Sequence, residues 1–161
     1  MTDITAPPPL DDLDRRILDQ LQQDCSLSNL DLAARVHASP PTCLRRVRKL
    51  AQSGLIQRQV AILDPARLGA ALTAIIEVSL DVQAAAQLDA VEADLVLEPE
   101  IQQCYRVSSG PDFVLVAQVA DMAAYQDLAL RRLTGDPRVR NVRSFFATAR
   151  SKFDTRIPIV R

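Results

Sequence analysis

The spacing of the hydrophobic residues changes once along this chain, and that change limits the folds it can adopt. Leu13, Ile17 and Leu21 recur every four residues, as on one face of an α-helix. From Leu72 to Leu80 every second residue is apolar, as in a β-strand with one buried face. Asp64, Pro65 and Gly69 interrupt the chain between the two patterns. We therefore predict an α+β protein whose 161 residues form a helical unit followed by a sheet unit.

Helix start and stop signals divide the helical unit into three helices. The first is expected to end near Asp24. Ser28 is placed to cap a second, short helix, because an acidic residue follows three positions later as in a capping box. Ser39 before two prolines is the start signal of a third helix, which should stop at Gly54.

The second and third helices are joined by a tight turn around His37, the single histidine. Histidine is among the residues that tolerate positive φ, so we interpret it as a turn residue rather than a ligand. The expected inner face of the short helix is Leu30, Ala33, Ala34 and Val36. In the third helix the expected buried stripe is Cys43, Val47 and Leu50, widened by Leu44. A short helix, a tight turn and an amphipathic helix predict a helix-turn-helix.

The net charge of −1 conceals an uneven distribution. Residues 1–31 carry seven acidic residues and two arginines, whereas residues 32–63 carry five arginines and one lysine with no acidic residue. The exposed side of the third helix is expected to hold Thr42, Arg45 and Lys49, flanked by Arg46 and Arg48. Such a positive segment in a nearly neutral protein predicts binding to a polyanion. A merely solvated charged face is the alternative.

The sheet unit is expected to have the order β-α-β-β-α-β, the ferredoxin-like arrangement. Its strands are residues 72–80, about 101–108, about 113–120 and about 139–150. A first helix should present Ala84, Leu88, Val91 and Leu95 to the sheet, and a second, about 121–134, should present Met122, Tyr125, Ala129 and Leu133. Helices on one face leave the other face, with Ile75, Val114 and Val116, to pair with a second copy.

The residues that enzyme and metal sites need are scarce. One histidine and three scattered cysteines cannot make a Ser-His-Asp triad or an ordinary zinc site within one chain. The best acid–base candidates lie in expected loops: Glu98 with Glu100, and Asp112 beside Ser109. Exposed loop acids are more often solvating groups than catalysts. We therefore predict that the protein is not an enzyme and holds no metal or cofactor.

The chain also lacks signals for membranes or export. No apolar run approaches the roughly 18 residues of a membrane span. Residues 1–9 have neither the basic start nor the apolar core of a secretory signal. Scattered, odd-numbered cysteines favour a reducing compartment. We expect a cytoplasmic protein with no membrane contact.

Residues 10–57 contain an ordered set of motifs that continues into the sheet unit. The set comprises Leu10-Asp11, Asp14, Ile17-Leu18, Leu21, Asp24, Ser28-Asn29, Ser39-Pro40 and Gly54. It is followed by Asp121-Met122, Tyr125, Pro137, Val139 and Arg143-Ser144. Over about residues 10–155 the chain resembles the Lrp/AsnC family of leucine-responsive and asparagine-synthase regulators.

Three positions depart from the family pattern. His37-Ala38 stands where the family commonly has Gly-Leu, and Arg45 stands where many relatives carry an acid. Relatives often read Gly-Asp-x-Asp in a loop where this chain reads Ser-Gly-Pro-Asp at residues 109–112. The recognition face is therefore expected to be more basic than usual, and the loop lacks one acid.

The resemblance implies a sequence-specific transcription regulator with a winged-helix-like or plain helix-turn-helix. It implies binding to double-stranded DNA as a two-fold dimer, assembly of dimers into tetramers or octamers, association with the nucleoid, and modulation by a small amino acid bound between dimers. The expected division is a disordered arm (1–9), a DNA-binding domain (10–58), a strand or hinge linker (59–71) and a ligand-sensing, oligomerising domain (72–161). An architectural protein that coats DNA with weak sequence preference and no effector is the alternative.

Candidate site residues follow from the residue chemistry and this resemblance together. The expected DNA contacts are Ser39, Thr42, Arg45, Arg46, Arg48, Lys49 and Arg58. Base edges suit Thr42, Arg45 and Lys49, while phosphates suit Arg46, Arg48 and Arg58. The expected effector residues are Ser108, Ser109, Gly110, Asp112, Thr134 and Ser144, because this tight loop offers N–H groups to a carboxylate and Asp112 suits an ammonium group. A plain hairpin turn explains the same loop equally well.

Overall fold

The computed structural model describes residues 9–159, which divide into two compact units. One unit comprises the residues up to Ile62 together with the C-terminal segment from Lys152, and the other comprises Leu63–Ser151. The predicted disordered arm lies outside the described residues except for Pro9. The C-terminal segment was expected with the sheet, but it groups with the helices because Ile157 hydrogen-bonds to Gln22 there.

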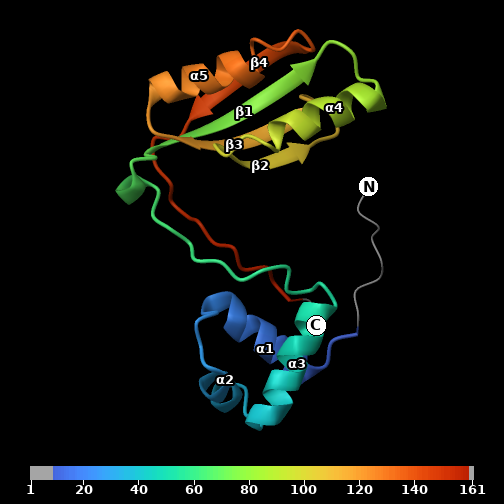
Figure 1. Ribbon diagram of the computed structural model, residues 1–161, viewed down its shortest axis with the longest axis vertical. Helices are drawn as coiled ribbons and strands as arrows, with labels where there is room; N and C mark the ends of the chain where they lie inside the picture. Colours follow the sequence, from blue (N-terminus) through green and yellow to red (C-terminus); the bar gives the residue numbers. More distant parts are fainter. Residues whose placement is uncertain (1–8, 160–161) are drawn as a thin grey trace. The chain divides into compact units, whose positions relative to one another are not determined.

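The first unit contains three helices, α1 (Asp12–Gln23), α2 (Asn29–Arg35) and α3 (Pro40–Gln52) (Figure 1). Ser28 and Ser39 cap α2 and α3 as predicted, since each side chain accepts the hydrogen bond of a backbone N–H three residues later. The turn between them places His37 at φ 53°, and α3 is followed by Gly54 at φ 78°. The predicted helix-turn-helix and its turn histidine are confirmed.

The core of the helical unit is smaller than the sequence pattern predicts. Its buried apolar residues are Ile17, Leu32, Ala33, Val36, Cys43 and Leu50. Leu30 and Ala34, expected on the inner face of α2, are exposed, and Leu44 of α3 is 38% exposed. Leu32 and Ala33 of this seven-residue helix, together with its C-cap Val36, already fill the side toward α3, so the neighbouring side chains face solvent.

The segment between the units, predicted as a strand or hinge linker over residues 59–71, contains no strand, so the strand part of that prediction is wrong. The described chain from residue 55 to 71 holds only one 3-10 turn, η1 (Ala66–Leu68), which ends at Gly69 with φ 78°. Val60, Ile62 and Leu63 are each more than half exposed. A lone extended segment has no partner for its backbone hydrogen bonds, so apolar composition alone does not make it a strand.

The second unit is the predicted β-α-β-β-α-β arrangement. Its elements are β1 (Leu72–Leu80), α4 (Ala85–Leu95), β2 (Ile101–Arg106), β3 (Phe113–Val119), α5 (Met122–Arg132) and β4 (Val139–Phe146). The strands form one antiparallel sheet in the order β2-β3-β1-β4. Figure 1 shows α4 and α5 on the same face of this sheet. The ferredoxin-like prediction is confirmed.

The core of the sheet unit lies between that face and the two helices. It is built from alternate residues of β1 and β3, with Val91 and Leu95 of α4 and Leu128 and Leu133 of α5. Two expected inward residues are not there: Ala84 is the exposed N-cap of α4, and Met122 is 44% exposed. Both occur at the first positions of their helices, where the side chain leaves the packed face.

The opposite side of the sheet, which we call the open sheet face, carries an apolar stripe across all four strands. Register places Tyr105 opposite Val114, Val116 opposite Ile75, and Ile75 opposite Phe145. Ile75, Tyr105 and Phe145 are 42%, 52% and 46% exposed. A contiguous apolar stripe of this kind is typical of an interaction surface.

Candidate nucleic-acid interface and ligand pocket

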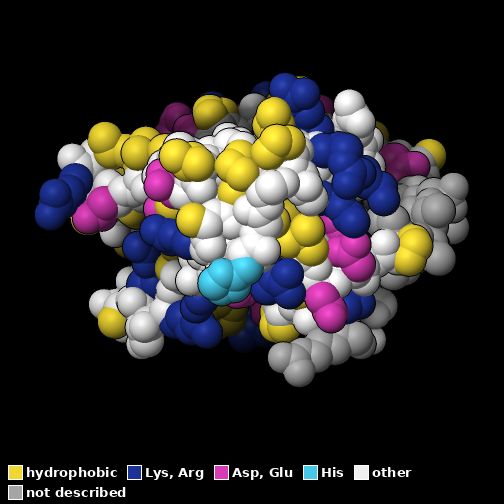
Figure 2. All heavy atoms as spheres, turned by 90° about the horizontal axis from the view of Figure 1, so that it is seen from below, with side chains coloured by type: hydrophobic (Ala, Val, Ile, Leu, Met, Phe, Trp, Pro, Cys, Tyr) yellow, Lys and Arg dark blue, Asp and Glu magenta, His cyan; other side chains and the backbone are white. Residues whose placement is uncertain are grey.

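The exposed side of α3 gathers the predicted polar and basic side chains. A shallow hollow of about 500 Å³ is lined by Pro41, Leu44, Arg45, Arg48, Lys49 and Gln52. Arg45, Arg48 and Lys49 are all exposed. Figure 2 shows one face of the protein, on which several groups of Lys and Arg side chains are exposed. This side of α3 therefore combines positive charge with donors that can reach a polyanion.

The start of α3 is organised by Ser39. Its hydroxyl accepts the backbone N–H of Thr42 at 3.4 Å and donates to the Thr42 hydroxyl oxygen at 2.9 Å. The Thr42 hydroxyl keeps its own proton for a further bond. Ser39 thus serves the helix cap and orients Thr42 on the exposed side of α3.

Arg46 points in another direction from the other basic residues of α3. Its Nη1 lies 3.1 Å from both carboxylate oxygens of Asp14 and 2.6 Å from Oδ2 of Asp11. The Asp14 side chain is only 3% exposed, so this contact joins α1 to α3 inside the unit. The pKa of Asp11 is lowered, first by the backbone N–H of Asp14 and also by Arg46. Arg46, predicted as a phosphate contact, is held here in an ion pair that joins α1 to α3.

Arg58 lies beyond α3 in the extended segment and is exposed. It is the single charged residue between Gly54 and Leu63. The structure therefore leaves the side chains of Arg45, Arg48, Lys49 and Arg58 exposed and that of Thr42 partly exposed, whereas the Arg46 guanidinium is engaged by Asp11 and Asp14.

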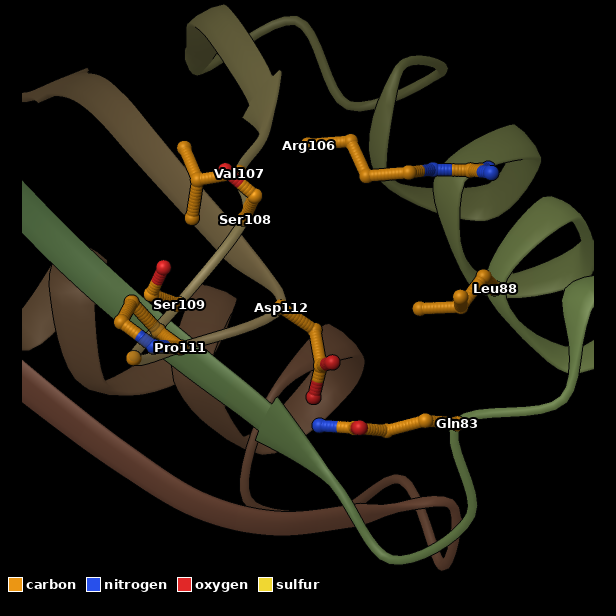
Figure 3. Close-up of a pocket in the computed structure, with 9 residues that line it drawn as sticks. Gln83, Leu88, Arg106, Val107, Ser108, Ser109, Pro111 and Asp112 are labelled. Atoms are coloured by element: carbon orange, nitrogen blue, oxygen red, sulfur yellow. The ribbon is translucent and has the colours of Figure 1, made fainter.

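A second candidate site is a pocket of about 420 Å³ at the β2–β3 loop (Figure 3). It is lined by Gln83, Leu88, Arg106 and residues 107–112. Ser109 and Gly110 both have positive φ, 71° and 98°, so the loop is the tight turn that its residue types indicate. Predicted residues 108, 109, 110 and 112 are thus brought together around one cavity.

Asp112 has a structural role that the sequence did not reveal. The residue is 7% exposed, and its Oδ2 accepts the Leu80 N–H at 2.7 Å. Its own N–H donates to the Val78 carbonyl at 2.8 Å. The expectation of an exposed loop acid is therefore wrong, because the side chain joins the end of β1 to the loop. In Figure 3 the carboxylate nevertheless faces the Gln83 side chain at the pocket.

Thr134 and Ser144, predicted as effector contacts, do not line this pocket. The Thr134 hydroxyl donates to the Ala129 carbonyl at 3.2 Å, completing the end of α5. The Ser144 hydroxyl is hydrogen-bonded to the Tyr125 hydroxyl between β4 and α5. Both side chains satisfy neighbouring groups on the helix-covered side of the sheet.

Three pocket residues were missed by sequence reasoning. Gln83 follows β1, Leu88 belongs to α4, and Arg106 ends β2, so only the strand register and helix packing bring them to the loop. The Arg106 guanidinium is bound by Asp89 at 2.8 Å and by Glu92, both on α4. These carboxylates raise the pKa of Arg106 and offset its charge at the pocket rim.

Glu98 and Glu100, two of the acids considered for catalysis, instead form an ion cluster with arginines of α5. Glu98 is 6% exposed and binds Arg131 Nη1 and Arg132 Nε, each at 2.5 Å. Burial alone would raise the pKa of Glu98, but the hydrogen bonds from the two arginines outweigh it, so the pKa is lowered. A carboxylate held ionised in this way is a poor proton donor. Glu98 is thus not the exposed loop acid that was expected.

Residues 9–159 contain no group of three or more His, Cys, Asp or Glu side chains that would hold a metal ion. No helix in the same range is long and apolar enough to cross a membrane.

Each of the two units matches a known protein family. Residues 10–57 match the winged helix-turn-helix DNA-binding family, and residues 73–157 match the Lrp/AsnC ligand binding domain. The chain belongs to the Lrp/AsnC family. The leucine-responsive regulatory protein of Salmonella typhimurium is 37% identical over 150 residues, which cover 93% of this chain and 92% of that protein.

Two solved structures of transcriptional regulators resemble this chain over most of its length. An AsnC family regulator from Agrobacterium tumefaciens is 34% identical with a TM-score of 0.86, covering 92% of this chain and 97% of its own. A regulator from Neisseria meningitidis in complex with L-methionine is 31% identical with a TM-score of 0.88, covering 93% and 97%. This chain is therefore a DNA-binding transcription regulator with a ligand-binding domain, and its family is one of regulators rather than of enzymes.

Proposed function

We propose that this Lrp/AsnC regulator binds discrete duplex sites as a dimer through α3, and that an amino acid at the β2–β3 loop modulates this binding. The observation that carries the DNA part is the exposed basic side of α3 in a segment without acids. Arg45 suits bidentate pairing to guanine, with Thr42 and Lys49 beside it at the base edges. Arg48 and Arg58 suit phosphates, which supply affinity without sequence choice. Such a protein acts in the cytoplasm, at the nucleoid.

The open sheet face supports the dimer. A second copy would cover Ile75, Tyr105 and Phe145, which otherwise expose apolar surface to water. We expect Ile75→Asp to weaken self-association, as light scattering would show, with the fold retained because residue 75 is exposed. A wild-type monomer at all concentrations that still binds palindromic DNA tightly would contradict the dimer.

The pocket at the β2–β3 loop supports a small zwitterion. Its loop N–H groups suit a carboxylate, Asp112 suits an ammonium group, and Leu88 offers one apolar contact. The bound L-methionine of the Neisseria meningitidis relative supports the same chemical class. A thermal-shift screen of the amino acids tests this, because a ligand that binds only the folded state raises its stability.

Asp112→Asn separates ligand binding from folding. The amide oxygen can still accept the Leu80 N–H, whereas the charge for an ammonium group is gone. We expect a melting temperature near that of the wild type and a large loss of amino-acid affinity by calorimetry. Unchanged affinity in the folded variant would reject Asp112 as a ligand residue and leave the loop as a turn.

Footprinting on genomic DNA tests the DNA part as a whole. Discrete protected sites are expected of a regulator. Uniform protection would favour the coating alternative, and absence of protection would overturn the proposed DNA binding by α3.

A further inference from the structure

An exposed leucine interrupts the basic side of α3. Leu44 is 38% exposed and lines the hollow together with Pro41, Arg45 and Arg48. The core of the helical unit is already closed by Cys43 and Leu50 on the same helix, which are 0% and 3% exposed. Leu44 is therefore displayed on the surface that carries the candidate DNA contacts.

The chemistry of DNA limits what an exposed leucine can meet there. Phosphates and most base-edge atoms are polar, and covering them with an aliphatic side chain removes their water without a replacement hydrogen bond. The C5-methyl group of thymine is the apolar group that base pairs present in the major groove. A leucine beside Arg45 is thus matched to a thymine methyl next to a hydrogen-bonded base.

We infer that Leu44 contacts a thymine methyl group and selects a T·A pair at one position of each half-site. The inference rests on the proposed role of α3 in DNA binding. Pro41, which lines the same hollow, widens the apolar contact. Arg45 and Leu44 would then read neighbouring positions, one by hydrogen bonds and the other by apolar contact.

The test uses the full chain and replaces thymine by deoxyuridine, which pairs in the same way but lacks the methyl group. A preferred duplex is first selected from a random pool by binding, and its thymines are then replaced one position at a time, symmetrically in both half-sites. At one position we expect the wild-type affinity to fall about fourfold per half-site, as for loss of one buried methyl group. At the other positions we expect little change.

Variants assign the effect to Leu44. Leu44→Ala should bind the thymine and deoxyuridine duplexes equally, whereas Leu44→Met, which keeps an apolar side chain of similar volume, should retain the preference. Leu30→Ala removes an exposed leucine from α2 and serves as the matched control, so its preference should equal that of the wild type. Thermal melting checks that each variant is folded.

Two results would overturn the inference while leaving DNA binding intact: no thymine position sensitive to deoxyuridine, or full sensitivity in folded Leu44→Ala. Failure of the wild type to select any duplex would instead remove the proposed DNA-binding function on which the inference rests.

Discussion

The side-chain amide of Gln22 forms two hydrogen bonds with the backbone of Ile157. Its Nε2 donates to the Ile157 carbonyl at 3.2 Å, and its Oε1 accepts the Ile157 N–H at 2.6 Å. These groups are 135 residues apart in sequence. The C-terminal segment is thereby attached to α1 of the helical unit, after the chain has passed through the whole sheet unit.

Gln22→Ala should release this segment. We expect faster amide exchange at Ile157 and faster proteolysis after residue 151, with a stability loss of about 1 kcal/mol or less because such exposed hydrogen bonds contribute little. Gln20→Ala, on the same helix, is the control. Unchanged exchange at Ile157 in the Gln22 variant would show that the amide does not hold the segment.

Substitutions at the adjacent residues Arg45 and Arg46 should affect different properties of the protein. Arg46→Ala leaves the buried Asp14 carboxylate without its cationic partner, so we expect a loss of about 2 kcal/mol in the free energy of unfolding. Arg45 is exposed. Arg45→Ala should therefore change the free energy of unfolding by less than about 0.5 kcal/mol while altering DNA sequence preference. Chemical denaturation and binding to a set of duplexes measure the two effects. Equal stability losses would contradict this division.

The Glu98 cluster should make stability depend on pH. The folded pKa lies below the ordinary value of 4.5, so Glu98 keeps its charge to lower pH in the folded chain than in the unfolded one. Its contribution is therefore complete above about pH 4.5 and is lost as the pH falls through the folded pKa. Urea denaturation of wild type and Glu98→Gln should give stabilities that differ at pH 7 and converge toward pH 3. A constant difference would refute the assignment.

Gly135, which follows α5, has no room for a side chain. A Cβ there would lie 2.0 Å from the Leu130 carbonyl oxygen and 3.1 Å from its carbon, both backbone atoms. We expect Gly135→Ala to cost about 1–3 kcal/mol, because the backbone must shift. Gly54→Ala is the comparison, since its surroundings are open and only the positive φ opposes a side chain. A larger loss at Gly54 than at Gly135 would show that the close contact is easily relieved.

Much of the fold follows from signals between residues close in sequence. Ser28 and Ser39 cap helices because the groups they satisfy lie three residues away, and Gly54 follows α3 because it tolerates positive φ. The two-residue period of β1 places its inner side chains in the core without reference to distant partners. For these reasons the three helices of the helical unit, the four strands of the sheet unit and their order along the chain could be predicted.

The sites depended on contacts between distant residues. Arg46 binds Asp14 32 residues away, and Asp112 binds the Leu80 backbone 32 residues away, so both side chains make structural contacts that their local sequence does not indicate. The apolar segment around Val60 is not a strand because, within residues 9–159, it makes no ladder of backbone hydrogen bonds with another segment. The sequence determined where helices are capped and which segments alternate as strands, since those signals are local. Only the tertiary structure decided which charged side chains form ion pairs within the fold and which remain exposed at the surface, because ion pairs depend on how separate elements pack.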